Sequence, residues 1–161
     1  MARLIGPELT EDLSRHLDGS GIGSKADKAI VIVTIGADGW PHPAMLSYFE
    51  VVAKDPRTLH VAAYGTSRTT ANMRERGKAT LVLADHRLTC YIKGTVDALA
   101  PAMRSAPYNA RLQFRVEQVW MDEPHPALEP GAFVSAGITY TRRTDDALAK
   151  AEAILAELLH E

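Results

Sequence analysis

One short stretch of the chain gathers side chains that can bind an anion. Residues 65–72 read Gly-Thr-Ser-Arg-Thr-Thr-Ala-Asn, which places four hydroxyls, one amide and one guanidinium close together. The spacing of Thr70, Met73 and Arg74, with Gly77 behind them, predicts that a short helix starts here and ends at a glycine cap. Free backbone N–H groups make a helix start electropositive, and Asp or Glu commonly compensates that charge. In this stretch no acid occurs before Glu75.

A bound phosphate could supply the missing negative charge. Hydroxyls and backbone amides would donate to its oxygens, and Arg68 would add a charge-assisted hydrogen bond. The alternative is an ordinary helix cap formed by Ser67 or Thr66, with Arg68 in solvent. The spacing leaves both interpretations open. The candidate anion-binding residues are Thr66, Ser67, Arg68, Thr69, Thr70 and Asn72.

Other familiar motifs are incomplete or absent from the sequence. The six histidines show no paired metal-ligand spacing, and the single cysteine, Cys90, excludes intrachain disulfides and Cys-based zinc or iron–sulfur sites. We therefore expect no metal site. Glycines 19, 21 and 23 follow a predicted helix and precede a predicted strand, the reverse of the order that a dinucleotide-binding fingerprint requires.

The composition limits the class of protein. The chain has 161 residues, 46% of them hydrophobic, and its 18 Lys and Arg against 20 Asp and Glu give a net charge of −2. This length suits one domain, and the lack of a basic surplus argues against nucleic acid or a membrane surface as a partner. The first sixteen residues resemble no secretory signal, and the longest apolar run, 29–33, is far below the ~18 residues that span a bilayer. We expect a cytoplasmic location.

The pattern of elements predicts a mainly β (α+β) fold. A single helical stretch lies between strands in the middle of the chain, which excludes an alternating strand–helix parallel sheet and favours an antiparallel barrel or sandwich. An amphipathic helix is expected at about 7–17 and another at about 144–160. The predicted strands are 28–35, 42–52, 58–64, 78–84, 88–96 and 111–121.

Taken together, these segments resemble the pyridoxamine 5′-phosphate oxidase-like, FMN-binding split-barrel superfamily. The likeness covers roughly residues 28–96, with a weaker echo at 111–121, and it rests on the order and spacing of several short pieces. These pieces are residues 37–41 (ADGWP), 43–47 (PAMLS), 59–68 (LHVAAYGTSR), 72–73 (NM), 79–83 (ATLVL) and 94–96 (GTV).

The resemblance implies a fold and an assembly. It implies that residues 1–161 form one domain, a six-stranded antiparallel split β-barrel with peripheral helices. It also implies a homodimer that holds FMN in two clefts at the subunit interface. The apolar strand at 112–120 is a candidate for that subunit contact.

The resemblance also implies roles for individual residues. In the family a Ser-Arg-Lys-like segment holds the FMN phosphate; Ser67 and Arg68 match it, and Thr69 stands in place of the lysine. The remaining implied cofactor contacts are Met45, Leu46 and Ser47 along the isoalloxazine ring, Ala62 and Ala63 beneath the ring or ribityl chain, and Thr89 near the pyrimidine edge.

The expected function is that of an FMN-binding oxidoreductase acting on an unidentified small molecule. A flavin carries the hydride chemistry itself, so the protein supplies donors, an apolar wall and an open face. The sequence assigns no catalytic acid or base. Related members use a deazaflavin in place of FMN. The residues are also compatible with a non-catalytic flavin or haem binder, with His42 or His86 as the axial ligand, and with a barrel that dimerises and binds nothing.

Overall fold

The computed structural model describes residues 1–141 and 146–160. The helical elements in these residues are α1 (Glu11–His16), α2 (Ile22–Lys25), the 3-10 turn η1 (Tyr48–Glu50), α3 (Arg68–Arg76) and α4 (Ala147–His160). No helix in the described ranges is long and apolar enough to cross a membrane. The strands are β1 (Ala2–Gly6), β2 (Ala29–Ile35), β3 (Pro41–Ser47), β4 (Val51–Asp55), β5 (Thr58–Tyr64), β6 (Lys78–Asp85), β7 (Leu88–Ala100) and β8 (Asn109–Asp122).

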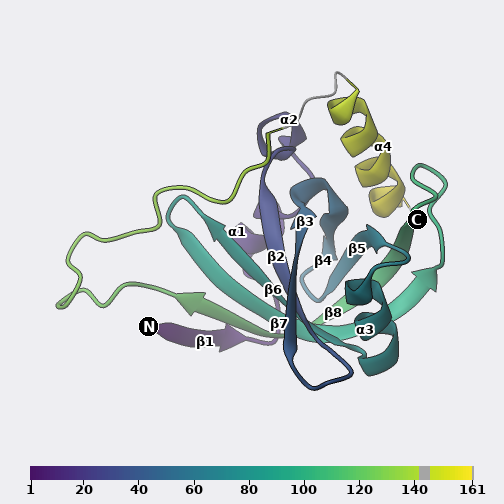
Figure 1. Cartoon of the computed structure of the whole chain (residues 1–161). Helices are drawn as coiled ribbons and strands as arrows, with labels where there is room; N and C mark the ends of the chain where they lie inside the picture. Colours follow the sequence, from purple (N-terminus) through teal and green to yellow (C-terminus); the bar gives the residue numbers. More distant parts are fainter. Residues whose placement is uncertain (142–145, 161) are drawn as a thin grey trace.

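All strand pairs are antiparallel, and the sheet runs in the order β3-β2-β6-β7-β8-β5-β4, with β1 paired to β8 (Figure 1). The expected mainly β architecture is confirmed. The described residues form eight strands where six were expected. One reason is that η1 interrupts the predicted strand at 42–52, because the Glu50 carboxylate accepts a hydrogen bond from the Ser47 N–H at 2.7 Å and turns the chain. The other is β1, a short and largely exposed strand that carries no strong hydrophobic pattern.

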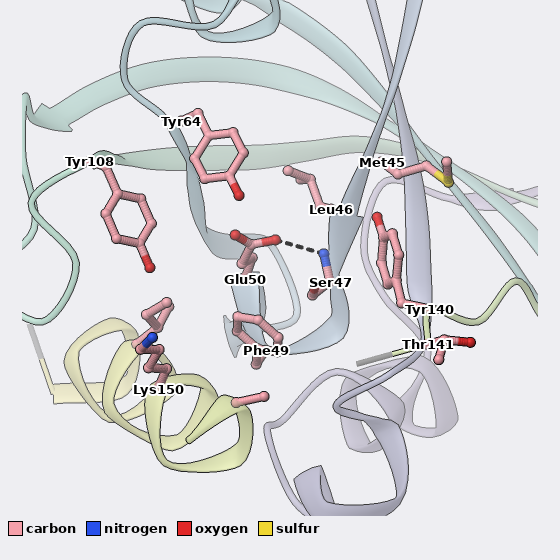
Figure 2. Close-up of a pocket in the computed structure, with 12 residues that line it drawn as sticks. Met45, Leu46, Ser47, Phe49, Glu50, Tyr64, Tyr108, Tyr140, Thr141 and Lys150 are labelled. Atoms are coloured by element: carbon pink, nitrogen blue, oxygen red, sulfur yellow. Dashed lines mark hydrogen bonds between the residues drawn. The ribbon is translucent and has the colours of Figure 1, made fainter. Parts of the chain in front are cut away.

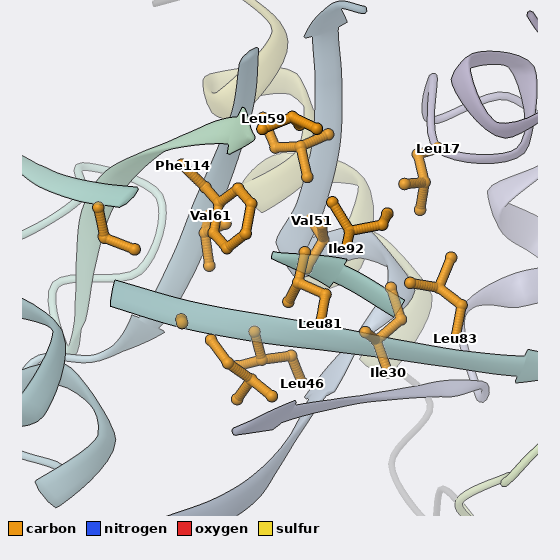
Figure 3. Close-up of a cluster of buried hydrophobic side chains, with 14 of the residues drawn as sticks. Leu17, Ile30, Leu46, Val51, Leu59, Val61, Leu81, Leu83, Ile92 and Phe114 are labelled. Carbon is orange, nitrogen blue, oxygen red and sulfur yellow. The ribbon is translucent and has the colours of Figure 1, made fainter. Parts of the chain in front are cut away.

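Alternating side chains from most of the strands fill the centre of the barrel (Figure 3). Leu59, Leu81, Ile92, Leu112 and Phe114 are completely shielded from solvent there. This packing explains why the predicted strands alternate apolar and polar residues: each strand turns one face to the core and the other outward.

A second apolar cluster lies on the outer face of β5, beneath α4. Ala62 on β5 and Val52 on β4 pack there against Ile154 and Leu158 of the helix. Leu59, Val61 and Ala63 on the same strand point into the barrel. Strand β5 is therefore covered on both faces, and α4 lies beside it in Figure 1.

The ends of the helices refine the sequence predictions. The helix expected over 7–17 spans only Glu11–His16, because the Thr10 side chain accepts a hydrogen bond from the Leu13 N–H and starts the helix at that point. The helix expected over 144–160 is observed as Ala147–His160, and its predicted first residues, 144 and 145, lie outside the described residues. The predicted glycine cap of α3 is confirmed at Gly77, whose φ is +63°.

Candidate functional site

The chain turns from β5 into α3 around the carbonyl of Tyr64. That oxygen accepts the Ser67 N–H at 2.9 Å and the Thr70 hydroxyl at 2.8 Å. Ser67 is the N-cap, and its side-chain oxygen accepts the Thr70 N–H at 3.1 Å. The ordinary capping predicted for Ser67 is therefore present. These bonds fix the first turn of α3 to the end of the strand.

The start of α3 has no compensating negative charge. Its first turn holds no acid, and the one acid of the helix, Glu75, forms an ion pair with Arg76 at 2.8 Å at the opposite end. Arg68 is exposed, and none of the ion pairs among the described residues includes it. The positive end of the α3 dipole and the Arg68 guanidinium therefore both attract an anion that approaches this corner.

The six candidate anion-binding residues divide into two groups. Thr66 and Arg68 are exposed and Ser67 is half-buried, so all three can meet a ligand. Thr69, Thr70 and Asn72 are buried. The Thr70 hydroxyl is used by the Tyr64 carbonyl, and the Asn72 amide donates to the Thr34 hydroxyl at 3.0 Å.

A cavity of about 500 Å³ adjoins this corner at Tyr64, and Figure 2 shows residues that line it. Tyr64 belongs to both, because its side chain lines the cavity and its carbonyl holds the first turn of α3. Of the predicted ring contacts, Met45, Leu46 and Ser47 all line the cavity. The complete lining is Met45, Leu46, Ser47, Phe49, Glu50, Tyr64, Tyr108, Tyr140, Thr141, Ala147, Lys150 and Ile154.

Nine of the twelve predicted cofactor contacts are not part of this lining: the six candidate anion-binding residues, and Ala62, Ala63 and Thr89. Ala63 is buried in the barrel and Ala62 beneath α4, so neither side chain is part of the lining. Thr89 pairs with Ala84 near the β6–β7 turn. The end of α3 meets β7 at Val96, whose N–H donates to the Gly77 carbonyl at 2.9 Å. These two points are seven positions apart on β7, about 23 Å along a strand, so Thr89 lies well away from the end of α3 that Val96 contacts.

Several lining residues were not predicted from the sequence. Tyr108, from the β7–β8 connection, lies against Tyr64 with ring centroids 5.8 Å apart, and its carbonyl accepts the Gly65 N–H at 2.9 Å. Tyr140 and Lys150 come from still further along the chain. Long-range contacts of this kind leave no mark in local spacing, and the only available signal was the presence of aromatic residues in predicted connections.

The acidic and basic lining residues have partners within the chain. Glu50 accepts the Ser47 N–H, and the Lys150 ammonium lies 2.7 Å from Asp146. The side-chain hydrogen bond and the charge of Asp146 raise the pKa of Lys150, which keeps this amine protonated. Among the described residues that line the cavity, no side chain has the character of a free acid–base catalyst.

The described residues also form a second cavity, and they hold no candidate metal centre. Within residues 1–141 and 146–160, no group of three His, Cys, Asp or Glu side chains is placed to hold a metal ion. A second cavity of about 320 Å³ lies over β2, β6, β7 and β8. His42 and His86, the candidate haem ligands, line neither cavity, and the His86 Nδ1 lies 3.0 Å from the Ser135 carbonyl.

Comparison with known proteins places the chain in a family. Residues 24–134 match the family model described as pyridoxamine 5′-phosphate oxidase. The chain belongs to the pyridoxamine 5′-phosphate oxidase family. YclD of Bacillus subtilis (strain 168), an uncharacterised protein, is 31% identical to this family member over 115 residues, which cover 71% of the chain and 74% of YclD.

Solved structures of other proteins share the fold of this family member. A candidate pyridoxamine 5′-phosphate oxidase of Lactobacillus delbrueckii, 19% identical, covers 74% of the chain and 98% of its own length with a TM-score of 0.57. HupZ of Group A Streptococcus, 15% identical, covers 80% of the chain and 100% of its own length with a TM-score of 0.55. The segment after residue 134, with α4, lies outside the family match.

Proposed function

We propose that this chain binds FMN and acts as a flavin-dependent oxidoreductase on a small molecule. The observation that carries the proposal is the uncompensated start of α3, hydrogen-bonded to a residue that lines a 500 Å³ cavity. A phosphate matches the exposed donors at this corner, and a cavity of this size is within the usual range of about 300–1,000 Å³ for small-molecule sites. The membership of the family supports the same cofactor.

The residues present fit both ends of the cofactor. Ser67, Arg68 and the backbone N–H groups of the first turn of α3 would hold the phosphate. Met45 and Leu46 would give the ring an apolar wall, with Ser47 beside them. When bound, FMN supplies the transfer of a hydride to or from a substrate. The chain contributes binding, orientation and partial exclusion of water. Because Thr69 stands in place of a lysine, Arg68 is the cationic side chain of the segment 67–69.

We also propose that the working form is a homodimer. The strand at 112–120, the contact expected from the sequence, is a poor surface for it, because Leu112, Phe114 and Val119 are fully buried within the chain. The β2–β3 hairpin offers a better one, since Ile35, Trp40 and Met45 expose 42%, 74% and 53% of their surfaces. We expect light scattering to give about twice the chain mass of 17.5 kDa. A monomeric mass would contradict this assembly.

Mass spectrometry of the small molecules released from freshly purified protein tests the proposed cofactor. We expect the mass of FMN and a yellow protein with flavin absorbance. A deazaflavin mass would change the identity of the proposed cofactor and would leave the proposed phosphate site in place. A haem spectrum, or a colourless protein that adding FMN leaves unchanged, would overturn the proposal.

A further inference from the structure

The cavity has two walls of different origin. Residues that match the family model supply one, including Met45, Tyr64 and Tyr108. The segment beyond residue 134 supplies the other, with Tyr140 and Lys150. Figure 2 shows Tyr64 and Tyr108 on one side of the space and Tyr140 on the other, where Met45 of the first wall lies beside it. The second wall therefore gives the cavity side chains that the part of the chain matching the family does not supply.

This second wall is held firmly in place. The Tyr140 N–H donates to the Asp27 carbonyl at 2.6 Å. Helix α4 is fixed to the β7–β8 connection, because the Glu157 carboxylate accepts the N–H groups of Arg104 at 2.9 Å and Ser105 at 2.7 Å. The same connection carries Tyr108, so these hydrogen bonds also hold Tyr108 close to α4.

The first wall presents aromatic surface to the cavity. The Tyr64 and Tyr108 rings are 63% and 57% exposed, and their planes are tilted by 59°. Neither phenolic hydroxyl forms a hydrogen bond with a described residue. In Figure 2 both hydroxyls point toward the side of the cavity where Glu50 and Lys150 lie. Two exposed rings with available hydroxyls offer both stacking and hydrogen bonding to a ligand.

The charges at the cavity do not call for a charged ligand. Lys150 is neutralised by Asp146 at 2.7 Å, and Glu50 already accepts a backbone hydrogen bond from Ser47. An anionic guest would have to give up its hydration without gaining an unpaired positive charge, because the Lys150 ammonium is already paired with Asp146. A neutral guest has no such cost.

We infer that this cavity takes an uncharged, flat aromatic substrate of one or two fused rings. Its ring stacks on the face of one of the two tyrosines, Tyr64 or Tyr108, and meets the other at a tilt. A carbonyl oxygen or ring nitrogen accepts a hydrogen bond from one of the two phenols. This inference rests on the proposed function, whose substrate class it names. Tyr108 is the specificity-determining residue, because it presents a ring and a hydroxyl and is not among the phosphate or flavin contacts.

A fluorescence titration with Prodan, a neutral dimethylamino-naphthyl ketone, tests the inference. We expect binding to the purified protein with a blue-shifted emission. Acetophenone should displace the probe, and cyclohexyl methyl ketone, its non-aromatic analogue, should not. Equal competition by the two ketones, or tighter binding of the anionic anilinonaphthalene sulfonate than of Prodan, would overturn the inference.

Variants test whether Prodan binds at Tyr64 and Tyr108. We expect Tyr108→Leu to weaken Prodan roughly five- to tenfold, and Tyr108→Phe roughly two- to threefold, since it removes only the hydroxyl. Phe133→Leu, which removes an exposed aromatic ring that lines neither cavity, should leave the Prodan affinity unchanged. Prodan affinities for Tyr108→Leu and Tyr64→Leu both equal to the parent's would overturn the inference.

The same variants keep this inference distinct from the proposed cofactor. Tyr108→Leu should retain its affinity for FMN, and Arg68→Ala should lose FMN and retain Prodan. Failure of FMN binding alone would therefore count against the cofactor, and failure of Prodan binding alone against the substrate class.

Discussion

The side chains at the start of α3 have different tasks although their types are similar. Ser67 caps the helix, Thr70 binds the Tyr64 carbonyl, and Asn72 reaches inward to Thr34, while Arg68 remains exposed. The Asn72–Thr34 bond links α3 to strand β2, and the Thr34 hydroxyl lies 3.4 Å from the His42 carbonyl of β3. The buried polar residues thus position the helix, and the exposed ones are left for a ligand.

Asn72→Ala should lower stability more than it lowers cofactor affinity. The change removes a buried hydrogen bond of 3.0 Å and leaves the Thr34 hydroxyl without this donor, a loss of about 1–3 kcal/mol. Urea unfolding of Asn72→Ala, Thr34→Val and the double variant measures it. We expect the losses to be clearly non-additive. Additive losses, or an unchanged midpoint for Asn72→Ala, would refute the structural role.

His60 makes the attachment of α4 sensitive to pH. Burial lowers the pKa of this imidazole below its ordinary value of 6.5, and the charges of Lys54 and Arg111 act in the same direction, against Asp55 and the Leu158 carbonyl. Its Nδ1 lies 3.0 Å from that carbonyl on α4. The unfolded chain then takes up a proton at a higher pH than the folded chain does. Stability should therefore fall as the pH drops through 6.5.

Thermal unfolding between pH 7.5 and 5.5 tests this expectation. His60→Gln should show a shallower loss of stability than the parent over this range. His125→Gln, a change in an exposed loop, should follow the parent. The same slope in the parent and in His60→Gln would rule out this histidine as the source. Burial also lowers the pKa of His16, so part of the slope should remain in His60→Gln.

At the scale of elements, local patterns predicted what depends on neighbours in the sequence. The strands that alternate apolar and polar residues, the glycine at the end of α3 and the acid-free start of that helix were all readable from spacing. The cavity was not, because Tyr64 and Tyr108 meet through a contact between residues 44 positions apart. Nor could spacing tell that Thr70 and Asn72 turn inward, since direction is decided by what packs against α3.

Gly94 shows why one of the short family-like pieces cannot tolerate a side chain. A Cβ at this position would lie 2.1 Å from the Arg115 carbonyl and 2.4 Å from the Phe114 ring, at an irregularity in the β7–β8 pairing. Gly94→Ala should therefore destabilise the barrel by about 2–3 kcal/mol. Gly6→Ala is the matched control, because nothing lies within 4 Å of its added Cβ. Equal unfolding midpoints for the two variants would contradict this close approach.

At the scale of the whole molecule, the barrel and the segment beyond residue 134 contribute different parts of the cavity. The barrel carries the start of α3 and the strand wall at Met45–Leu46. The segment beyond the family match closes the cavity from the other side with Tyr140 and α4. The barrel therefore accounts for the proposed cofactor and, through Tyr64 and Tyr108, for the proposed substrate class, while the added segment completes the lining of the cavity. The central claim is the phosphate site, since the position of the flavin ring depends on it.

The affinities of FMN and riboflavin, measured by flavin fluorescence on the parent and on Arg68→Ala, test that claim most directly. The two ligands differ only in the phosphate. We expect the parent to bind FMN at least tenfold more tightly, and Arg68→Ala to lose most of this preference, because a charge-assisted hydrogen bond contributes about 1.5–3 kcal/mol. Arg76→Ala, at the other end of α3, should keep it. Equal affinities of the parent for FMN and riboflavin would contradict the account.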